Sequence, residues 1–528
     1  MKRLTAIFAV ALVLVGFISL PASAYYMTMT KIGEGTVSPS IGANSYGIFS
    51  RVTIRATPAA GWVFDRWEGD MRGKSNPYSF YITGDKTASA IFRPVTATSS
   101  NALVRYVGKY DASTSHTKID VDTHVGWDGY EMSLNSQNWR TTADVDRPLW
   151  QHDLTMAVPW FAGDDCIFLI NGGSNPLKYP SPDGTIAAVC VFLGVSMAQL
   201  DQVPNQPLYF TDEVNNSRTE DEILAYSLDK YLDTGDSEWP VHSAMTKSAV
   251  KAMDAIQAEV GRLDDFLVIG ASKRGWATWL TTAIDPRVKQ IMPLVIDVLN
   301  FPNQVEHHWE SYGSYSSAIQ DYVDFDLFCR VDSDPRADDL LNIVDPYRYI
   351  SRYTHPKFIV NASGDQFFLP DSSRFYFNQL PNLAQTYLRY MPNKDHYMEG
   401  VLDDYNNLLG LLTWGVNAMN GTANPQYSWT INAANQIVVQ TSSGPSSVKL
   451  WQATNPNARD FRLETVGPIY TSSTLTDQGG GTYIGYCPPP AQGWTAYFVE
   501  LTFGTQVFTT QIVVTPDFDP YDGLGCWD

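Results

Sequence analysis

One stretch decides the fold of this chain: Phe266-Leu267-Val268-Ile269-Gly270-Ala271-Ser272-Lys273-Arg274-Gly275. Its four apolar residues predict a short buried strand. The apolar residues Trp276, Trp279, Leu280 and Ala283 follow, and they share one face of a helix. A serine on a sharp turn between a strand and a helix has its hydroxyl clear of the backbone, as in a nucleophile elbow. The sequence therefore predicts that Ser272 is a nucleophile.

The region around this stretch alternates between predicted strands and helices, from about residue 102 to 424. Short buried strands are predicted at 167–170, 187–193, 291–296, 358–360 and 387–390, and helices at 249–260 and 406–419. This alternation predicts an α/β fold with a mostly parallel central sheet. Residues 201–244 are long for a plain connection and include an acidic helical piece, so we expect a cap or lid there.

The N-terminus has the features of a secretion signal. Lys2 and Arg3 precede an apolar run that ends at Leu20, and Ala22-Ser23-Ala24 fits a cleavage site. Residues 1–24 are therefore expected to be removed, leaving no membrane span in the mature chain. We expect a protein that is secreted, periplasmic or held at the cell surface.

Two further units flank the α/β region. Residues 25–94 show the period-two alternation of strands, and residues 95–101 have the composition of a linker. Residues 425–528 contain short strands without intervening helices, which predicts a β-sandwich. Trp62 and Trp67 of the first unit could be carbohydrate platforms, but packing in a small core is the favoured interpretation.

Charge and cysteine content exclude several classes of partner. Acidic residues outnumber basic ones, 56 to 36, for a formal charge of −20, which argues against nucleic acid or an anionic membrane as partner. No Cys/His spacing typical of zinc is present, and we expect neither a metal nor a cofactor. Of the five cysteines, Cys487 and Cys526 could form a disulfide, a question that spacing alone leaves open.

A nucleophilic serine needs a histidine base and a carboxylate, which follow it in that fold in the order Ser, Asp or Glu, His. Of the eight histidines, only His396 follows the last predicted strand of the α/β region, so it is the expected base. Asp365, after the strand at 358–360, is the expected acid. Asp297, which ends an earlier strand, is the rival acid.

Two backbone N–H groups should stabilise the oxyanion. Lys273 supplies one because it follows the nucleophile, and Gly172 is expected to supply the other from the turn Asn171-Gly172-Gly173. The substrate pocket is predicted to include Asn171 and the tryptophans Trp160, Trp276 and Trp309. One feature departs from the usual elbow, because Arg274 stands where a small residue is normally found.

Several segments resemble the PhoPQ-activated pathogenicity-related protein family. They include Val268 to Trp279, Trp239 to Val250, Val295 to Asn300 and Asn171 to Pro176, and the likeness covers roughly residues 101 to 515. It implies a secreted or periplasmic α/β-hydrolase fold followed by a C-terminal β domain.

Two further likenesses concern single segments of the chain. The segment Gly61 to Asp70 resembles the divergent InlB-type B-repeat of bacterial surface proteins. This likeness implies a small β module with a contact to a cell surface or a polysaccharide. The elbow is also similar to that of glucuronoyl esterases, which implies that the basic side chain of Lys273 assists the oxyanion.

These observations together predict a serine hydrolase that acts on a small carboxylic ester through Ser272, His396 and Asp365. A serine peptidase of the same fold uses the same chemistry. A catalytically inactive surface-binding protein is the third interpretation, and an active-site serine probe would distinguish it from the other two.

Overall fold

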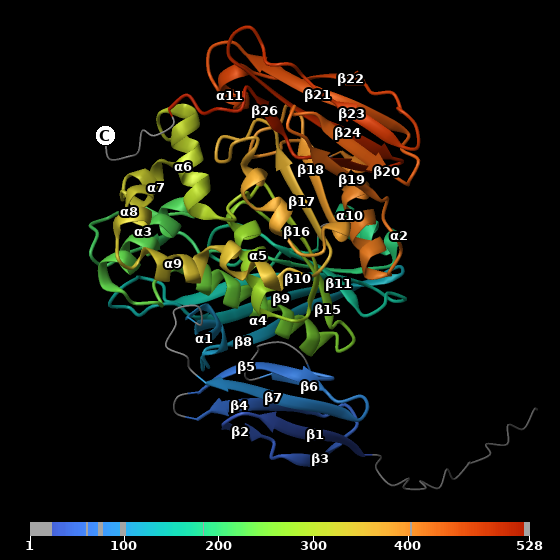
Figure 1. The fold of residues 1–528 in the computed structure, drawn as a ribbon. Coiled ribbons are helices and arrows are strands. Elements are labelled where there is room, and N and C mark those ends of the chain that lie inside the picture. The colour runs from blue at the N-terminus through green and yellow to red at the C-terminus, as the bar shows by residue number, and fades with distance from the viewer. Residues whose placement is uncertain are drawn as a thin grey trace, which may run out of the picture.

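The computed structural model describes residues 24–59, 62–71, 78–94, 102–182, 184–401 and 404–521. The expected linker and all of the expected signal peptide except Ala24 lie outside these residues. The N-terminal strands, the central sheet with its helices and the C-terminal strands form three successive layers from bottom to top in Figure 1. No helix among the described residues is long and apolar enough to span a bilayer.

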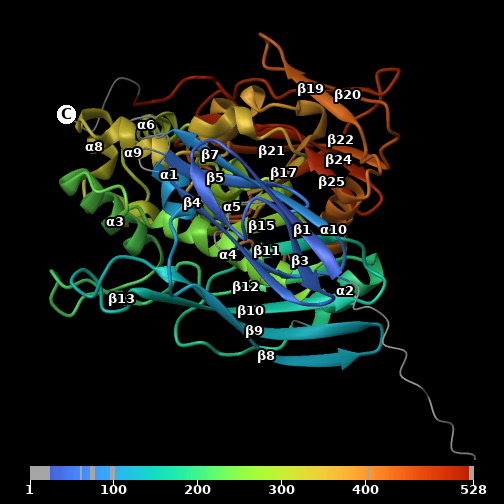
Figure 2. The same cartoon turned by 90° about the horizontal axis from the view of Figure 1, so that it is seen from below.

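The central sheet is mixed. In the described part of the chain it has nine strands in the order β18-β17-β16-β15-β11-β12-β10-β9-β8. The six strands from β18 to β12 are parallel, which confirms the mostly parallel sheet. Antiparallel β10, β9 and β8 form one edge, which is visible in the view from below (Figure 2). The bounds are β8 (Ser115–His124), β9 (Trp127–Asn138), β10 (Leu149–Pro159), β11 (Asp165–Ile170), β12 (Ser196–Leu200), β15 (Asp265–Ala271), β16 (Val288–Leu294), β17 (Lys357–Ala362) and β18 (Thr386–Met391).

Helices cover both faces of this sheet. Along β15, Phe266 and Val268 pack into one core and Leu267 and Ile269 into another, as the period of two requires. The first core includes α4 (Val241–Glu259) and α5 (Lys273–Ile284), and the second includes α2 (Gly184–Leu193) and α10 (Tyr405–Met419). The strand predicted at 187–193 is wrong because this segment is α2. A short apolar run alone does not distinguish a buried helix from a buried strand.

A helical cap covers the carboxyl edge of the parallel strands. Residues 201–244, the predicted cap, contribute α3 (Glu220–Thr234). The connection after β16 contributes more, and this part of the cap was not predicted from the sequence. It contains α6 (Phe301–Tyr312), α7 (Gln320–Val323), α8 (Leu327–Ser333) and α9 (Ala337–Val344). Helix α3 packs against α7, α8 and α9, and these helices lie together in Figure 1.

The N-terminal unit is built from two small sheets with the orders β3-β1-β7-β5 and β2-β4-β6. Trp67 is fully buried against Phe64, with ring centroids 5.1 Å apart, and Trp62 packs against the same core. The tryptophans therefore pack in the core, as favoured. The strands are β1 (Ala24–Ile32), β2 (Gly35–Ser38), β3 (Gly42–Gly47), β4 (Arg51–Pro58), β5 (Trp62–Gly69), β6 (Tyr78–Tyr81) and β7 (Lys86–Pro94).

The C-terminal strands form two antiparallel sheets around one apolar core that includes Val439, Leu450 and Val499. Cys487 is a free cysteine, so the disulfide considered for it is wrong, whereas Cys329 is disulfide-bonded. The strands are β19 (Tyr427–Ile431), β20 (Ile437–Thr441), β21 (Ser447–Asn455), β22 (Thr471–Thr474), β23 (Thr482–Gly485), β24 (Trp494–Phe503), β25 (Gln506–Thr509) and β26 (Val513–Thr515).

Candidate active site

Ser272 lies on the turn between β15 and α5. Its backbone has φ 54° and ψ −129°, a conformation that a residue with a side chain rarely adopts. Its N–H donates to the carbonyl of Leu294, at 2.9 Å, at the end of β16. The neighbouring strand therefore holds this strained turn in place, as is common at functional sites.

Two glycines allow this turn to form. A Cβ on Gly270 would lie 2.4 Å from the carbonyl oxygen of Arg274. A Cβ on Gly275 would lie 2.6 Å from Ile296 and 2.9 Å from the carbonyl oxygen of Gly270. Small residues are thus needed two positions before and three positions after the serine. This explains why the elbow tolerates Arg274, whose side chain extends away from the contact between these two glycines.

The structure brings the three predicted catalytic residues together. His396 Nε2 lies 2.8 Å from Ser272 Oγ, and His396 Nδ1 lies 2.9 Å from Asp365 Oδ2. Asp365 follows β17 and His396 follows β18, so both lie at the carboxyl edge of the sheet with Ser272. Asp365 also accepts the backbone N–H of Phe367, at 2.7 Å, and the ring of Phe367 packs against the imidazole. These contacts fix the orientation of both side chains.

Asp297, the rival acid, lies elsewhere in the site. Its carboxylate accepts hydrogen bonds from the hydroxyls of Tyr376 and Tyr390, whereas the His396 ring bonds to Asp365. Burial raises the pKa of Asp297 to about 6, even though these hydroxyls favour the charged form. The prediction that Asp297 is the alternative acid is therefore wrong in geometry: it follows β16, the neighbour of β15, but its carboxylate faces the two tyrosine hydroxyls and not the His396 ring.

Of the two expected oxyanion groups, Lys273 directly follows Ser272, and Gly172 lies in the turn after the neighbouring strand. Gly172 follows β11, the strand paired with β15, and its α-carbon faces the guanidinium of Arg274, where a Cβ would approach to 2.7 Å. The side chain of Asn171 donates to Asp201 at 2.8 Å, so it stabilises this turn. Glycine at 172 thus lets the β11 turn approach the elbow closely.

The basic side chains of the elbow are already paired with α3. The Lys273 ammonium lies 2.9 Å from both Glu220 and Asp221, and Arg274 binds Glu220 with two nitrogens, at 2.6 and 2.7 Å. Burial opposes ionisation of Glu220, but Arg274 and Lys273 outweigh it and hold its pKa well below the usual range. The ammonium of Lys273 is therefore neutralised by carboxylates, which leaves its backbone N–H as the candidate oxyanion donor.

A cavity of about 70 Å³ lies beside Ser272. Of the three tryptophans predicted to line the pocket, Trp276 does so. Trp160 follows β10. Ala157 of β10 pairs with Met197, near the start of β12, so Trp160 lies at the edge of the sheet opposite to Ser272. Its side chain is 50% exposed. Trp309, on α6, packs against Tyr315. The predictions for Trp160 and Trp309 are therefore wrong, because the sequence around an isolated tryptophan does not reveal which side chains it meets in the fold.

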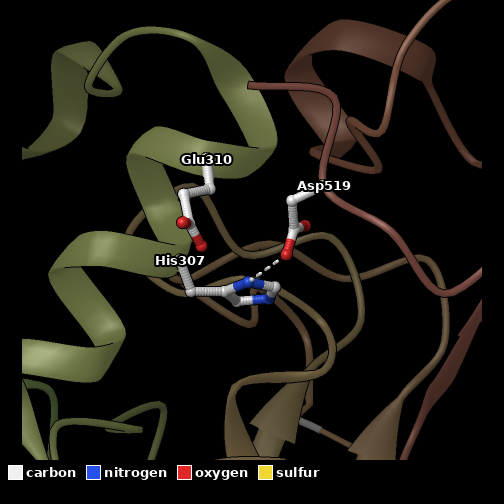
Figure 3. Close-up of side chains that lie close together, drawn as sticks. All are labelled: His307, Glu310 and Asp519. Carbon is white, nitrogen blue, oxygen red and sulfur yellow. Dashed lines mark hydrogen bonds and ion pairs between the residues drawn. The ribbon is translucent and has the colours of Figure 1, made fainter. Parts of the chain in front are cut away.

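A second cluster, His307, Glu310 and Asp519, lies where α6 meets the C-terminal segment (Figure 3). One ligand atom from each lies within 4.8 Å of the others. Asp519 is already bound by His307 Nδ1, at 3.2 Å, and by Arg459, at 3.0 Å. Because a guanidinium already supplies the positive charge, we assign no metal to this cluster.

This cluster continues into a buried ionic network. Asp371 lies 2.7 Å from Arg459 and 3.0 Å from His307 Nε2. Burial disfavours the imidazolium, but the charge of Asp371 and the bonds to Asp371 and Asp519 raise the pKa of His307. The network joins the α/β region to the C-terminal strands.

Replacing Arg459 by methionine is expected to lower the free energy of unfolding by about 3–5 kcal/mol, because it removes the fully buried cation paired with the Asp371 carboxylate. Arg374 also pairs with Asp371 but is 42% exposed, against 1% for Arg459. Arg374→Met is the matched control and should change stability by less than about 1 kcal/mol. Thermal unfolding of both variants measures the difference, and equal shifts would contradict a stabilising role for the buried pair.

A serine on a strained strand-to-helix turn, at the carboxyl edge of this mixed sheet, defines an α/β-hydrolase-type protein. The chain belongs to the PhoPQ-activated pathogenicity-related protein family, whose model matches residues 103–462. Residues 25–96 match the divergent InlB B-repeat domain. The expected resemblances to these two families are thereby confirmed, and the two regions follow one another in the expected order.

Individual proteins resemble the chain to different degrees. Autocrine proliferation repressor protein A of Dictyostelium discoideum is 32% identical over 459 residues, which cover 80% of this chain and 92% of that protein. Among solved structures, acetyl xylan esterase 1 of Thermoanaerobacterium sp. JW/SL YS485 has 13% identity and a TM-score of 0.42, covering 61% of this chain and 93% of that one. A glucuronoyl esterase of Solibacter usitatus has 13% identity and a TM-score of 0.35, covering 61% and 94%.

Proposed function

We propose that this protein is a serine hydrolase that cleaves carboxylic esters. The single observation that carries the proposal is the hydrogen-bond chain from Ser272 through His396 to Asp365, with links of 2.8 and 2.9 Å. A serine hydroxyl is a weak nucleophile until an oriented base removes its proton. This chain supplies both the base and the group that orients it.

The reaction would proceed in two stages. Ser272 Oγ attacks the acyl carbon while His396 Nε2 takes the hydroxyl proton, and Asp365 stabilises the imidazolium. The N–H groups of Lys273 and Gly172 stabilise the tetrahedral oxyanion. His396 then gives its proton to the departing alcohol, which leaves an acyl-enzyme. A water molecule, deprotonated by His396, hydrolyses that ester and restores Ser272.

A fluorophosphonate probe tests the proposal directly, because it forms a covalent bond only with an activated serine. We expect stoichiometric labelling of the wild-type protein, with the adduct mapped to the peptide that contains Ser272. No labelling, or an adduct on another serine, would favour a catalytically inactive binding protein. Parallel assays with small esters and small peptides then distinguish an esterase from a peptidase, since both form an acyl-enzyme.

We also propose that the protein acts outside the cytoplasm, at the cell surface or in a secreted form. The basic and apolar start of the chain and its cleavage site support this proposal. The B-repeat module at residues 25–96 agrees with contact to a surface or polysaccharide. Fractionation of the producing cells tests the location, and protein retained in the cytoplasm would contradict it.

A further inference from the structure

We propose that the cavity beside Ser272 receives the acyl group of the substrate and selects an apolar acyl chain longer than acetyl. This inference rests on the proposed esterase function and adds the class of acyl group. Three observations support it: the composition of the cavity wall, the identity of the catalytic residues that lie in that wall, and the volume of the cavity.

The wall of the cavity is mostly apolar. Cap helices and the strand ends both contribute, with Trp276, Ile296, Val298, Phe301, Val305, Ile319, Tyr322, Phe328, Phe367, Phe368 and Leu369. An apolar wall favours groups that gain free energy on leaving water. Such a wall disfavours a sugar or a charged acyl group, whose polar atoms would lose hydrogen bonds to water.

The ionisable groups of the wall are paired or neutral. The Lys273 ammonium is paired with Glu220 and Asp221. His308 Nε2 accepts the backbone N–H of Ser316 at 3.1 Å, and burial lowers the pKa of His308 to about 3, so the ring is neutral. The wall therefore offers no net charge to bind an ionic substituent.

The side of Ser272 on which the cavity lies indicates which half of an ester it receives. Ser272 and Lys273 line it, whereas His396 is not among its lining residues. The departing alcohol must lie next to His396, which protonates it. The acyl group remains bound to Ser272 Oγ with its oxygen towards the Lys273 N–H. The cavity is thus on the acyl side.

The volume of the cavity favours an acyl chain longer than acetyl. The centres of water-sized groups have about 70 Å³ of space in it, which is room for several carbons. An acetyl group would leave most of that space unfilled.

The test is a series of p-nitrophenyl esters with acetyl, hexanoyl, octanoyl and dodecanoyl groups, so that only the acyl chain varies. We expect kcat/KM for hexanoyl and octanoyl to exceed that for acetyl by at least about tenfold, the order of selectivity that apolar pockets provide. A protein that takes up the fluorophosphonate but prefers acetyl overturns the inference alone. A protein that neither reacts with the probe nor cleaves any ester overturns the proposed function as well.

Variants of the wall locate the selectivity. Val305→Phe on α6 should fill the cavity and lower the ratio of octanoyl to acetyl kcat/KM by at least about tenfold. Phe328→Ala on α8 should enlarge it and move the optimum to a longer chain. Val125→Phe is the matched control, since Val125 is 97% exposed on the β8–β9 turn, and it should leave the ratio unchanged. Equal ratios in all these variants and the wild type would overturn the inference.

Discussion

Replacing Ser272 by alanine is expected to lower ester turnover by about 10⁶-fold, as in serine hydrolases that lose their nucleophile. In the proposed mechanism this hydroxyl forms the bond to the acyl carbon, and no other hydroxyl is bonded to His396 Nε2 among the described residues. The backbone of the turn should persist, because the N–H of residue 272 still donates to Leu294. Steady-state hydrolysis of p-nitrophenyl esters and a thermal unfolding curve measure activity and folding separately.

The double variant gives a sharper control. Ser272 and His396 act as a unit, so Ser272→Ala, His396→Ala and the double variant should lose similar amounts of activity, because such effects are not additive. If the two single losses multiplied in the double variant, the residues would act independently, and the triad would be contradicted. Activity of Ser272→Ala close to that of the wild type would contradict the nucleophile itself.

The elbow and its partners were predictable because parallel strands align their carboxyl ends. The residues after 266–269, 358–360 and 387–390 therefore meet at one edge, whatever the loops between them. The order of Ser272, Asp365 and His396 along the chain then followed from the fold. The choice between Asp365 and Asp297 needed coordinates, because both follow parallel strands and only side-chain geometry distinguishes them.

The cap and the pocket were not predictable in the same way. Helices α6 and α8 contribute Val305 and Phe328 to the cavity, and the turn before α7 contributes Ile319. The positions of these segments depend on packing between parts far apart in the chain. The pairing of Lys273 with Glu220 likewise joins α5 to α3 across 53 residues of sequence. Periodicity reports which face of a helix is apolar, but it does not report which neighbour that face meets.

A pair of isosteric substitutions distinguishes the two buried carboxylates. Asp365→Asn is expected to lower kcat by about 10⁴-fold. The N–H of Phe367 donates to Asp365 Oδ1 at 2.7 Å, so the asparagine should keep its oxygen there and place its NH₂ against His396 Nδ1. That donor forces Nδ1 to accept, which moves the imidazole proton to Nε2. His396 then cannot take the proton of Ser272.

Asp297→Asn should change kcat by less than about tenfold, against about 10⁴-fold for Asp365→Asn, because Tyr376 and Tyr390 donate to Asp297 and an amide oxygen still accepts. Burial raises the pKa of Asp297 to about 6, so its ionisation lowers stability as the pH rises from about 4, its unfolded value. Asparagine cannot ionise, so this variant should retain its stability better than the wild type as the pH rises through that range. Turnover at pH 8 and unfolding midpoints from pH 4 to 8 measure both effects. If Asp297→Asn lost as much activity as Asp365→Asn while remaining folded, Asp365 could not be the only carboxylate that orients His396. Its assignment as the acid of the triad would then fail.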